Sequence, residues 1–164
     1  MRETSAPWWR GAHGEWYFLA QLALTAVLFL GPRTLSGLPE WPAHLARAFL
    51  FAGTALMIGG VGLLIAGLLQ LGSALTPLPY PRSHARLVRT GPYRIVRHPM
   101  YAGGILLAYG WALVVHGWLT LVYATVILIF LDIKSRREEQ WLTEKFSDYP
   151  DYRARVHKLI PFVY

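Results

Sequence analysis

Four apolar stretches alternate with polar segments along the 164-residue chain, and this pattern predicts membrane-spanning helices. A helix needs about 20 mostly apolar residues to cross a bilayer, within a range of about 17–25. We place four spans at about residues 13–31, 48–75, 99–116 and 117–133. For the first stretch a cleaved signal peptide is an alternative. The last two stretches could instead form a buried hairpin that does not cross fully.

The polar pair His116-Gly117 separates the last two stretches. Both stretches are short for a span, so we expect a tight helical hairpin with this polar pair at its tip. At the other end of the hairpin, we expect the helices to extend past Asp132 into water.

Two polar segments complete the chain, a loop at residues 76–98 and a C-terminal segment at residues 134–164. Prolines at the start of the loop exclude a helix there and favour an extended path; they are Pro77, Pro79 and Pro81. In the C-terminal segment, apolar positions at intervals of three and four predict a helix. Pro150 should interrupt this helix, and a second short helix is expected from Asp151 to Lys158.

The predicted fold is an all-α integral membrane protein with a single membrane domain over residues 1–164. It has four transmembrane helices, the last two forming the hairpin. The loop at 76–98 is expected to be cytoplasmic, and residues 134–164 are expected to fold over the hairpin as a cytoplasmic helical lid.

The charge distribution predicts the orientation of these spans. The net charge is +7, and no Asp or Glu occurs between Trp41 and Leu131. Lys and Arg concentrate in the two polar segments, at Arg82, Arg86, Arg89, Arg94, Arg97, Lys134, Arg136, Arg137, Lys145, Arg153, Arg155 and Lys158. Because such residues favour the cytoplasmic side, we expect both termini there and only Arg33 and Arg47 outside. We infer a multi-pass protein of a prokaryotic inner membrane.

The composition excludes several classes of protein. Hydrophobic residues make up 54% of the chain and charged residues only 15%, which excludes a disordered chain. A soluble nucleic-acid-binding domain can be as basic, but it does not carry such long apolar runs. The chain has no cysteine, which excludes disulfides, thiolate metal sites and thiol nucleophiles. We predict no metal site and no nucleic-acid partner.

The second span is rich in glycine and contains two pairs of small residues four positions apart, Ala55/Gly59 and Gly62/Ala66. Such pairs allow close approach of helices in lipid. We expect them to pack against other helices of this chain, with a homodimer seam as the alternative.

Two motifs bracket the hairpin. The first is Arg97-His98-Pro99-Met100-Tyr101-Ala102-Gly103, which fits the pattern RHPxYxG. The second begins at Glu138-Glu139 and continues through Leu142, Phe146, Tyr149, Tyr152, Val156 and Ile160-Pro161. Together they resemble the isoprenylcysteine carboxyl methyltransferase family, whose wider relatives include phospholipid N-methyltransferases. The resemblance covers roughly residues 87–162.

This resemblance implies an integral membrane enzyme that methylates a lipophilic acceptor reached from the bilayer, with S-adenosylmethionine as the methyl donor. It places cofactor contacts at Val88, Gly91, Tyr93, Arg97, His98, Tyr101, Gly103, Glu138 and Glu139, and catalytic roles at Lys134 and Glu139.

The residue types at these positions suit the cofactor. Arg97 and His98 can bind its carboxylate through charge-assisted hydrogen bonds. The glutamates can accept hydrogen bonds from its ammonium or ribose. Tyr93 and Tyr101 can stack on adenine or face the sulfonium, and the two glycines allow close backbone approach.

The acceptor stays open at this stage. Lys134 stands where the family has an arginine, and lysine cannot grip a carboxylate in the bidentate manner of arginine. A prenylcysteine-like carboxylate, a phospholipid amine and a small molecule methylated on N or S are the alternatives.

A protein that is not an enzyme is a further alternative. It would be a membrane scaffold, or a haem-associated protein that uses His44 and His116 near the outward interface.

Overall fold

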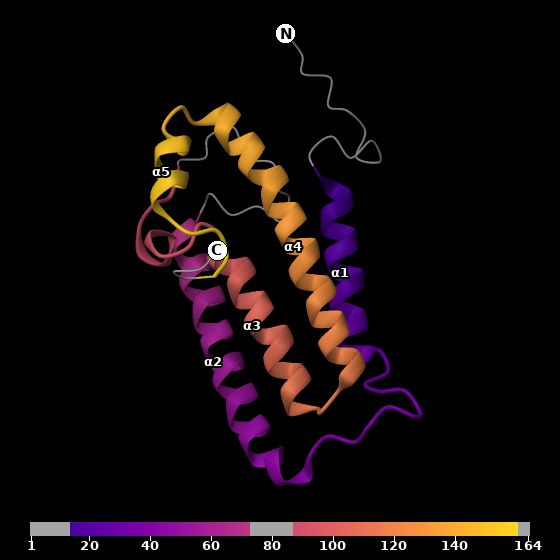
Figure 1. The fold of residues 1–164 in the computed structure, drawn as a ribbon. Coiled ribbons are helices and arrows are strands. Elements are labelled where there is room, and N and C mark those ends of the chain that lie inside the picture. The colour runs from indigo at the N-terminus through magenta and orange to yellow at the C-terminus, as the bar shows by residue number, and fades with distance from the viewer. Residues whose placement is uncertain (1–13, 73–86, 161–164) are drawn as a thin grey trace.

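Five α-helices and two short 3₁₀ helices make up the regular structure of the described residues (Figure 1). The computed structural model describes residues 14–72 and 87–160. The elements are α1 (Glu15–Leu30), η2 (Ala43–Leu45), α2 (Ala46–Leu71), η4 (Gly91–Arg94), α3 (Pro99–Val114), α4 (Trp118–Lys145) and α5 (Tyr149–Arg155). No strand occurs in these two ranges, so the predicted all-α class is confirmed for them.

The four long helices run alternately up and down in the spatial order α2, α3, α4 and α1 (Figure 1). The start of α1 and the end of α4 therefore lie at the same end of the bundle. Both η4 and α5 also lie at that end, where they form a cap beyond α2 and α3.

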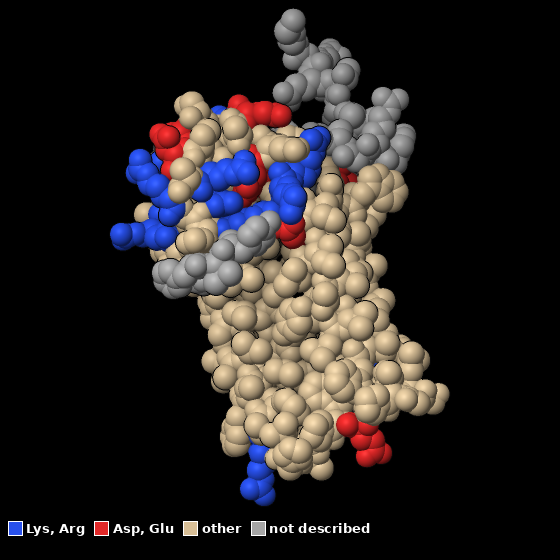
Figure 2. All heavy atoms as spheres, in the orientation of Figure 1, with Lys and Arg blue, Asp and Glu red and all other residues tan. Residues whose placement is uncertain are grey.

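The surface of the bundle is mostly apolar. Residues 43–71 and helix Trp118–Lys145 are long and apolar enough to cross a membrane, and only 11% and 33% of their most apolar windows are buried. Figure 2 shows a broad uncharged body, with most charged side chains gathered at the capped end. Such exposed apolar surface is typical of a membrane protein. Helices α1 and α3 are apolar but have only 16 residues each.

The predicted hairpin is confirmed at its tip. Helix α3 ends at Val114 and α4 begins at Trp118, and His116 adopts a left-handed backbone with φ of 51°. The N–H group of Gly117 donates a hydrogen bond to the carbonyl oxygen of Ala112 at 3.1 Å, which closes the turn.

The expected continuation of the last helix past Asp132 is confirmed, because α4 runs without a break to Lys145. The point at which the membrane span ends within this helix stays a prediction. Residues after 131 are good helix formers, and an ion pair one turn apart, between Asp132 and Arg136 at 2.8 Å, supports the continuation. The first twelve residues of the expected lid are thus a rigid extension of the hairpin.

The predicted position of the last helix is wrong, because α5 runs from Tyr149 to Arg155 and not from Asp151 to Lys158. Pro150 is the second residue of this helix and does not break it. A proline in the first turn removes an N–H group that would have no helical partner there. Helix α2 ends at Leu71, and residues 73–75 of the predicted second span lie outside the described residues. The prolines predicted to extend the loop lie outside the described residues.

Glycines on one face of α2 bring it very close to α3. A Cβ atom built on Gly60 would lie 2.7 Å from the carbonyl oxygen of Gly103, and one on Gly53 would lie 2.6 Å from that of Gly110. The predicted pairs lie on another face, because Gly59 and Gly62 have no such neighbour within 4 Å. The helix contact therefore follows a seven-residue spacing of glycines and not the expected four-residue spacing.

This packing predicts opposite effects of alanine at adjacent positions of α2. Gly59→Ala should be neutral or slightly stabilising, because alanine favours a helix over glycine by about 1 kcal/mol. Gly60→Ala should destabilise by about 1–3 kcal/mol, because its methyl group would overlap α3. Thermal unfolding in detergent measures both variants. Equal midpoints would contradict the α2–α3 contact.

Candidate functional site

The two sequence motifs meet at the capped end of the bundle. Arg97 and His98 precede α3, and Glu139 projects from the extension of α4. The Nε atom of Arg97 donates to Oε1 of Glu139 at 2.7 Å, and Nε2 of His98 lies 3.2 Å from the same oxygen. Nε of Arg153 lies 3.5 Å from the other carboxylate oxygen. Glu139 is 3% exposed, so these contacts partner a buried charge.

The neighbouring Glu138 joins the same network from the other side. The hydroxyl of Tyr101 donates to Oε2 of Glu138 at 2.8 Å. The imidazole of His98 stacks on the ring of Tyr101, with centroids 5.3 Å apart and planes within 3°. Its Nδ1 atom lies 3.7 Å from Glu138. His98 thus bridges the two glutamates. Pro99 starts α3 in a conformation that fixes the first turn, which places His98 and Tyr101 one above the other.

The C-terminal segment holds the first motif in place. Backbone N–H groups of Arg97 and His98 donate to the carbonyl oxygens of His157 and Lys158, at 2.8 and 3.2 Å. The guanidinium of Arg97 donates to the carbonyl oxygens of Arg153 and Val156. The residues after α5 therefore lie directly against the first motif and are hydrogen-bonded to its backbone.

Two further contacts anchor this segment. Nζ of Lys158 donates to Asp132 on α4 at 2.6 Å, and Lys158 is 7% exposed. The hydroxyl of Tyr152 donates to the carbonyl oxygen of Tyr93 in η4 at 2.6 Å. Burial raises the pKa of Tyr152 to about 12, so its phenol keeps the proton that it donates.

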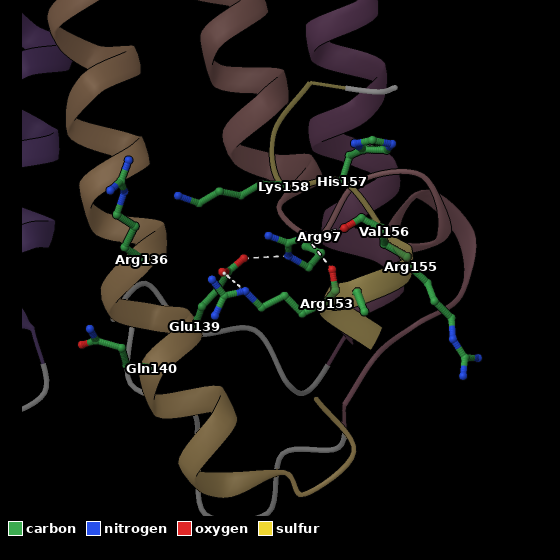
Figure 3. A pocket seen from close by; sticks show the side chains of 10 residues that line it. Arg97, Arg136, Glu139, Gln140, Arg153, Arg155, Val156, His157 and Lys158 are labelled. Carbon is green, nitrogen blue, oxygen red and sulfur yellow. Dashed lines mark hydrogen bonds and ion pairs between the residues drawn. The ribbon is translucent and has the colours of Figure 1, made fainter. Parts of the chain in front are cut away.

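A cavity of about 560 Å³ opens beside the Arg97–Glu139 pair (Figure 3). Arg97, Glu139 and Arg153 point toward one another along its wall. It is lined by Arg97, Arg136, Glu139, Gln140, Arg153, Ala154, Arg155, Val156, His157 and Lys158. Among the described lining residues Glu139 is the only carboxylate, and it is already paired, so this part of the lining is strongly cationic. Such a surface suits an anionic group.

The residues predicted to bind a cofactor fall into two groups. Arg97 and Glu139 line the cavity, and His98, Tyr101 and Glu138 connect to them by hydrogen bonds or stacking. The others do not line this cavity; they are Val88, Gly91, Tyr93 and Gly103.

The residues of the second group lie elsewhere in the cap or the bundle. Val88 is half-buried before η4. Gly91 begins η4 with φ of 60°, and a Cβ atom there would lie 3.0 Å from the side chain of Gln70. Tyr93 is buried under α5. The close backbone approach expected at Gly103 is toward Gly60 of α2, so its surroundings are those of helix packing.

Lys134, predicted to be catalytic, lies apart from the cavity. It is 3% exposed, and its Nζ atom donates to Oε1 of Gln21 on α1 at 2.6 Å. The ammonium also lies 5.2 Å from the ring centroid of Tyr101. Tyr101 therefore links Lys134 to the network around His98.

Several residues at this end were not predicted to belong to the site: Gln21, Asp132, Arg153, Val156 and Lys158. Arg153 and Lys158 entered the sequence analysis only as positive charges that predict the cytoplasmic side of the membrane. Gln21 offered a usable signal, because it is the only amide between Trp16 and Leu30, a stretch without Asp, Glu, Lys, Arg or His.

The two histidines considered for haem lie at the other end, in η2 and in the hairpin turn. The imidazole of His116 packs against Trp41 and Phe49, with ring centroids 5.5 and 6.1 Å away.

The chain was also compared with known proteins. A family model described as phospholipid methyltransferase matches residues 48–149, from the start of α2 to the start of α5. The matched region contains Arg97, His98 and both glutamates. No curated protein matches the chain. Because the family model covers more than half of the 164 residues, the chain belongs to the phospholipid methyltransferase family, a membership that implies methyltransferase activity.

Proposed function

We propose that this protein transfers a methyl group from S-adenosylmethionine to a lipophilic acceptor that reaches the site from the bilayer. The observation that carries the proposal is the meeting of the two motifs in one buried cluster, Arg97–Glu139–His98, beside a cationic cavity. This cluster lies where α3 begins, at the capped end of the bundle. Figure 2 shows that most charged side chains gather at this end, beyond a broad uncharged body. A donor bound in the cap and an acceptor held in the bilayer would meet there.

The groups around the cavity suit S-adenosylmethionine. Its carboxylate needs cations, and the guanidiniums of Arg97 and Arg153 face the cavity. Arg97 uses Nε and Nη1 within the protein, while its Nη2 atom has no partner among the described residues. The buried hydroxyl of Tyr149 likewise has none within them. These groups can bind the polar end of the cofactor, and when bound the cofactor supplies an electrophilic methyl group on a sulfonium.

The contacts of Glu139 favour a positioning role over proton transfer. Arg97 and His98 share one of its oxygens, and Arg153 approaches the other. A carboxylate held by three such groups stays ionised and is a poor proton acceptor. Within the proposal, Glu139 therefore orients Arg97 and His98 toward the cofactor.

Methyl transfer itself demands mainly alignment. A lone pair of the acceptor forms a bond to the methyl carbon while the carbon–sulfur bond breaks and its electrons return to sulfur. Orientation and exclusion of water can supply most of the rate. A carboxylate acceptor, as in a prenylcysteine, is already ionised, whereas a phospholipid amine must lose a proton to water. Within the proposal, the ammonium of Lys134, which lies 5.2 Å from the ring centroid of Tyr101, would hold an anionic group of either acceptor.

We further propose that all four long helices span the membrane, with the cap in the cytoplasm. The uncharged body in Figure 2 supports this arrangement, as does the concentration of Lys and Arg at the capped end. Helices α1 and α3 each span about 24 Å at 1.5 Å per residue, and they lie beside the two longer helices.

Cofactor binding tests the proposed function first. Isothermal titration calorimetry on the purified full-length protein should show micromolar affinity for S-adenosylmethionine. Glu139→Gln should weaken that affinity at least tenfold, or about 1.4 kcal/mol, because Arg97 and His98 lose their charged partner.

The matched control is Glu144→Gln, an exposed glutamate on the same helix, which should bind like the wild type. Absence of binding by folded wild-type protein would overturn the proposal. An equal loss in both variants would overturn the role given to Glu139.

Orientation can be tested with single cysteines, because the natural chain has none. Ser147→Cys places a thiol in the cap, and Ser36→Cys places one in the loop at the opposite end; both positions are exposed. A membrane-impermeant maleimide should label position 36 in intact cells and position 147 only after lysis. The reverse pattern would contradict the cytoplasmic cap.

A further inference from the structure

Three cationic side chains at the capped end have little exposed surface: Arg97, Lys134 and Lys158. Among the described residues, Lys134 alone of the three has no direct ion pair with a carboxylate, and Glu138 attracts it only from a longer distance. Arg97 pairs with Glu139, and Lys158 pairs with Asp132. Lys134 is the most deeply buried of these side chains, at 3% exposure, yet no carboxylate of the described residues lies within 4.0 Å of its ammonium. Burying an unpaired charge is costly, and such charges near a membrane usually serve a function.

The partner that Lys134 does have is neutral. Oε1 of Gln21 accepts a hydrogen bond from one of the three N–H groups of the Lys134 ammonium, at 2.6 Å. The ring centroid of Tyr101 lies 5.2 Å from the same ammonium. Within the described residues, the other two N–H bonds have no partner. A glutamine fixes the ammonium in place without neutralising it, whereas a glutamate at the same position would cancel its charge.

Gln21 comes from outside the part of the chain that carries the family match. That match begins at residue 48, and α1 ends at Leu30. Gln21 is the only amide along α1, and its Oε1 atom meets Lys134 across the α1–α4 contact.

We propose that Gln21 is a positioning residue which holds the ammonium of Lys134, free of a direct ion pair among the described residues, for an anionic group of the acceptor. This inference rests on the proposed function, and it names the acceptor class: an amphiphile that carries a phosphate or a carboxylate near the atom to be methylated. The Gln21–Lys134 pair then sets specificity from the bilayer side, while the cavity beside Arg97 serves the methyl donor.

A purely structural role makes a different prediction. Hydrogen bonds between polar side chains also join helices in membranes. If Gln21 only ties α1 to α4, Gln21→Glu should preserve or strengthen the contact and leave ligand binding unchanged. If Gln21 preserves the free charge, the same substitution should remove the preference for anions.

Three amphiphiles with the same C16 tail separate these readings: hexadecyl phosphate, palmitate and hexadecanol. Their affinities are measured by calorimetry with full-length protein in neutral detergent, saturated with S-adenosylmethionine. The wild type should bind at least one anionic probe tenfold or more tightly than hexadecanol. A preference for hexadecyl phosphate over palmitate would indicate a phosphate-bearing acceptor, and the reverse a carboxylate.

Gln21→Glu should lose this preference while its affinity for S-adenosylmethionine stays within twofold of the wild type. Lys134→Met is the second variant, and it should lose the preference because it lacks the ammonium. Thr25→Val, one turn along α1, and Arg137→Gln, a surface cation on α4, should keep the preference.

An equal affinity of the wild type for all three probes would overturn the inference, as would an unchanged preference in Gln21→Glu. Loss of the preference in Arg137→Gln would assign it to surface charge and would also overturn the inference. These results are distinct from failure of the proposed function, which would appear as no binding of S-adenosylmethionine to the wild type.

Discussion

The buried carboxylate of Glu139 is the point on which the capped end of this protein depends. It ties the extension of α4 to the segment before α3 through Arg97 and His98, and to α5 through Arg153. Removing one member of a buried ion pair leaves the other charged and unpaired, at a cost of about 3–5 kcal/mol. Arg97 also donates hydrogen bonds to the carbonyl oxygens of Arg153 and Val156 in the C-terminal segment. The Arg97–Glu139 pair therefore joins three parts of the chain.

The bundle below makes this arrangement possible. Close contact of glycines sets α2 against α3, and the turn at His116 sets α3 against α4. Because α4 continues as one helix beyond the apolar body, the positions of Glu138 and Glu139 relative to that body are fixed by the helix. The network that joins Lys134, Tyr101, His98 and the two glutamates therefore lies at the capped end, where α3 begins and α4 extends beyond the apolar body.

Sequence patterns predicted the helices, the hairpin and the pair of motifs that the structure brings together. The sequence patterns failed for features that depend on how the helices pack against one another. The glycines of α2 that touch α3 are Gly53, Gly60 and Gly67, and only the register with α3 distinguishes them from Gly59 and Gly62. The limits of α5 were missed because Pro150 was expected to interrupt a helix, whereas it lies in the first turn of α5, where proline is tolerated. Gln21 was missed because its partner lies on a distant helix.

A double-mutant cycle on S-adenosylmethionine affinity tests the central claim most directly. Arg97→Gln and Glu139→Gln are measured singly and together by calorimetry on the folded full-length protein. If the two residues act as one unit, the double variant should bind no more weakly than the worse single variant, with a coupling energy of about 0.5–3 kcal/mol. Losses that simply add would show that the two residues act independently and would contradict the account.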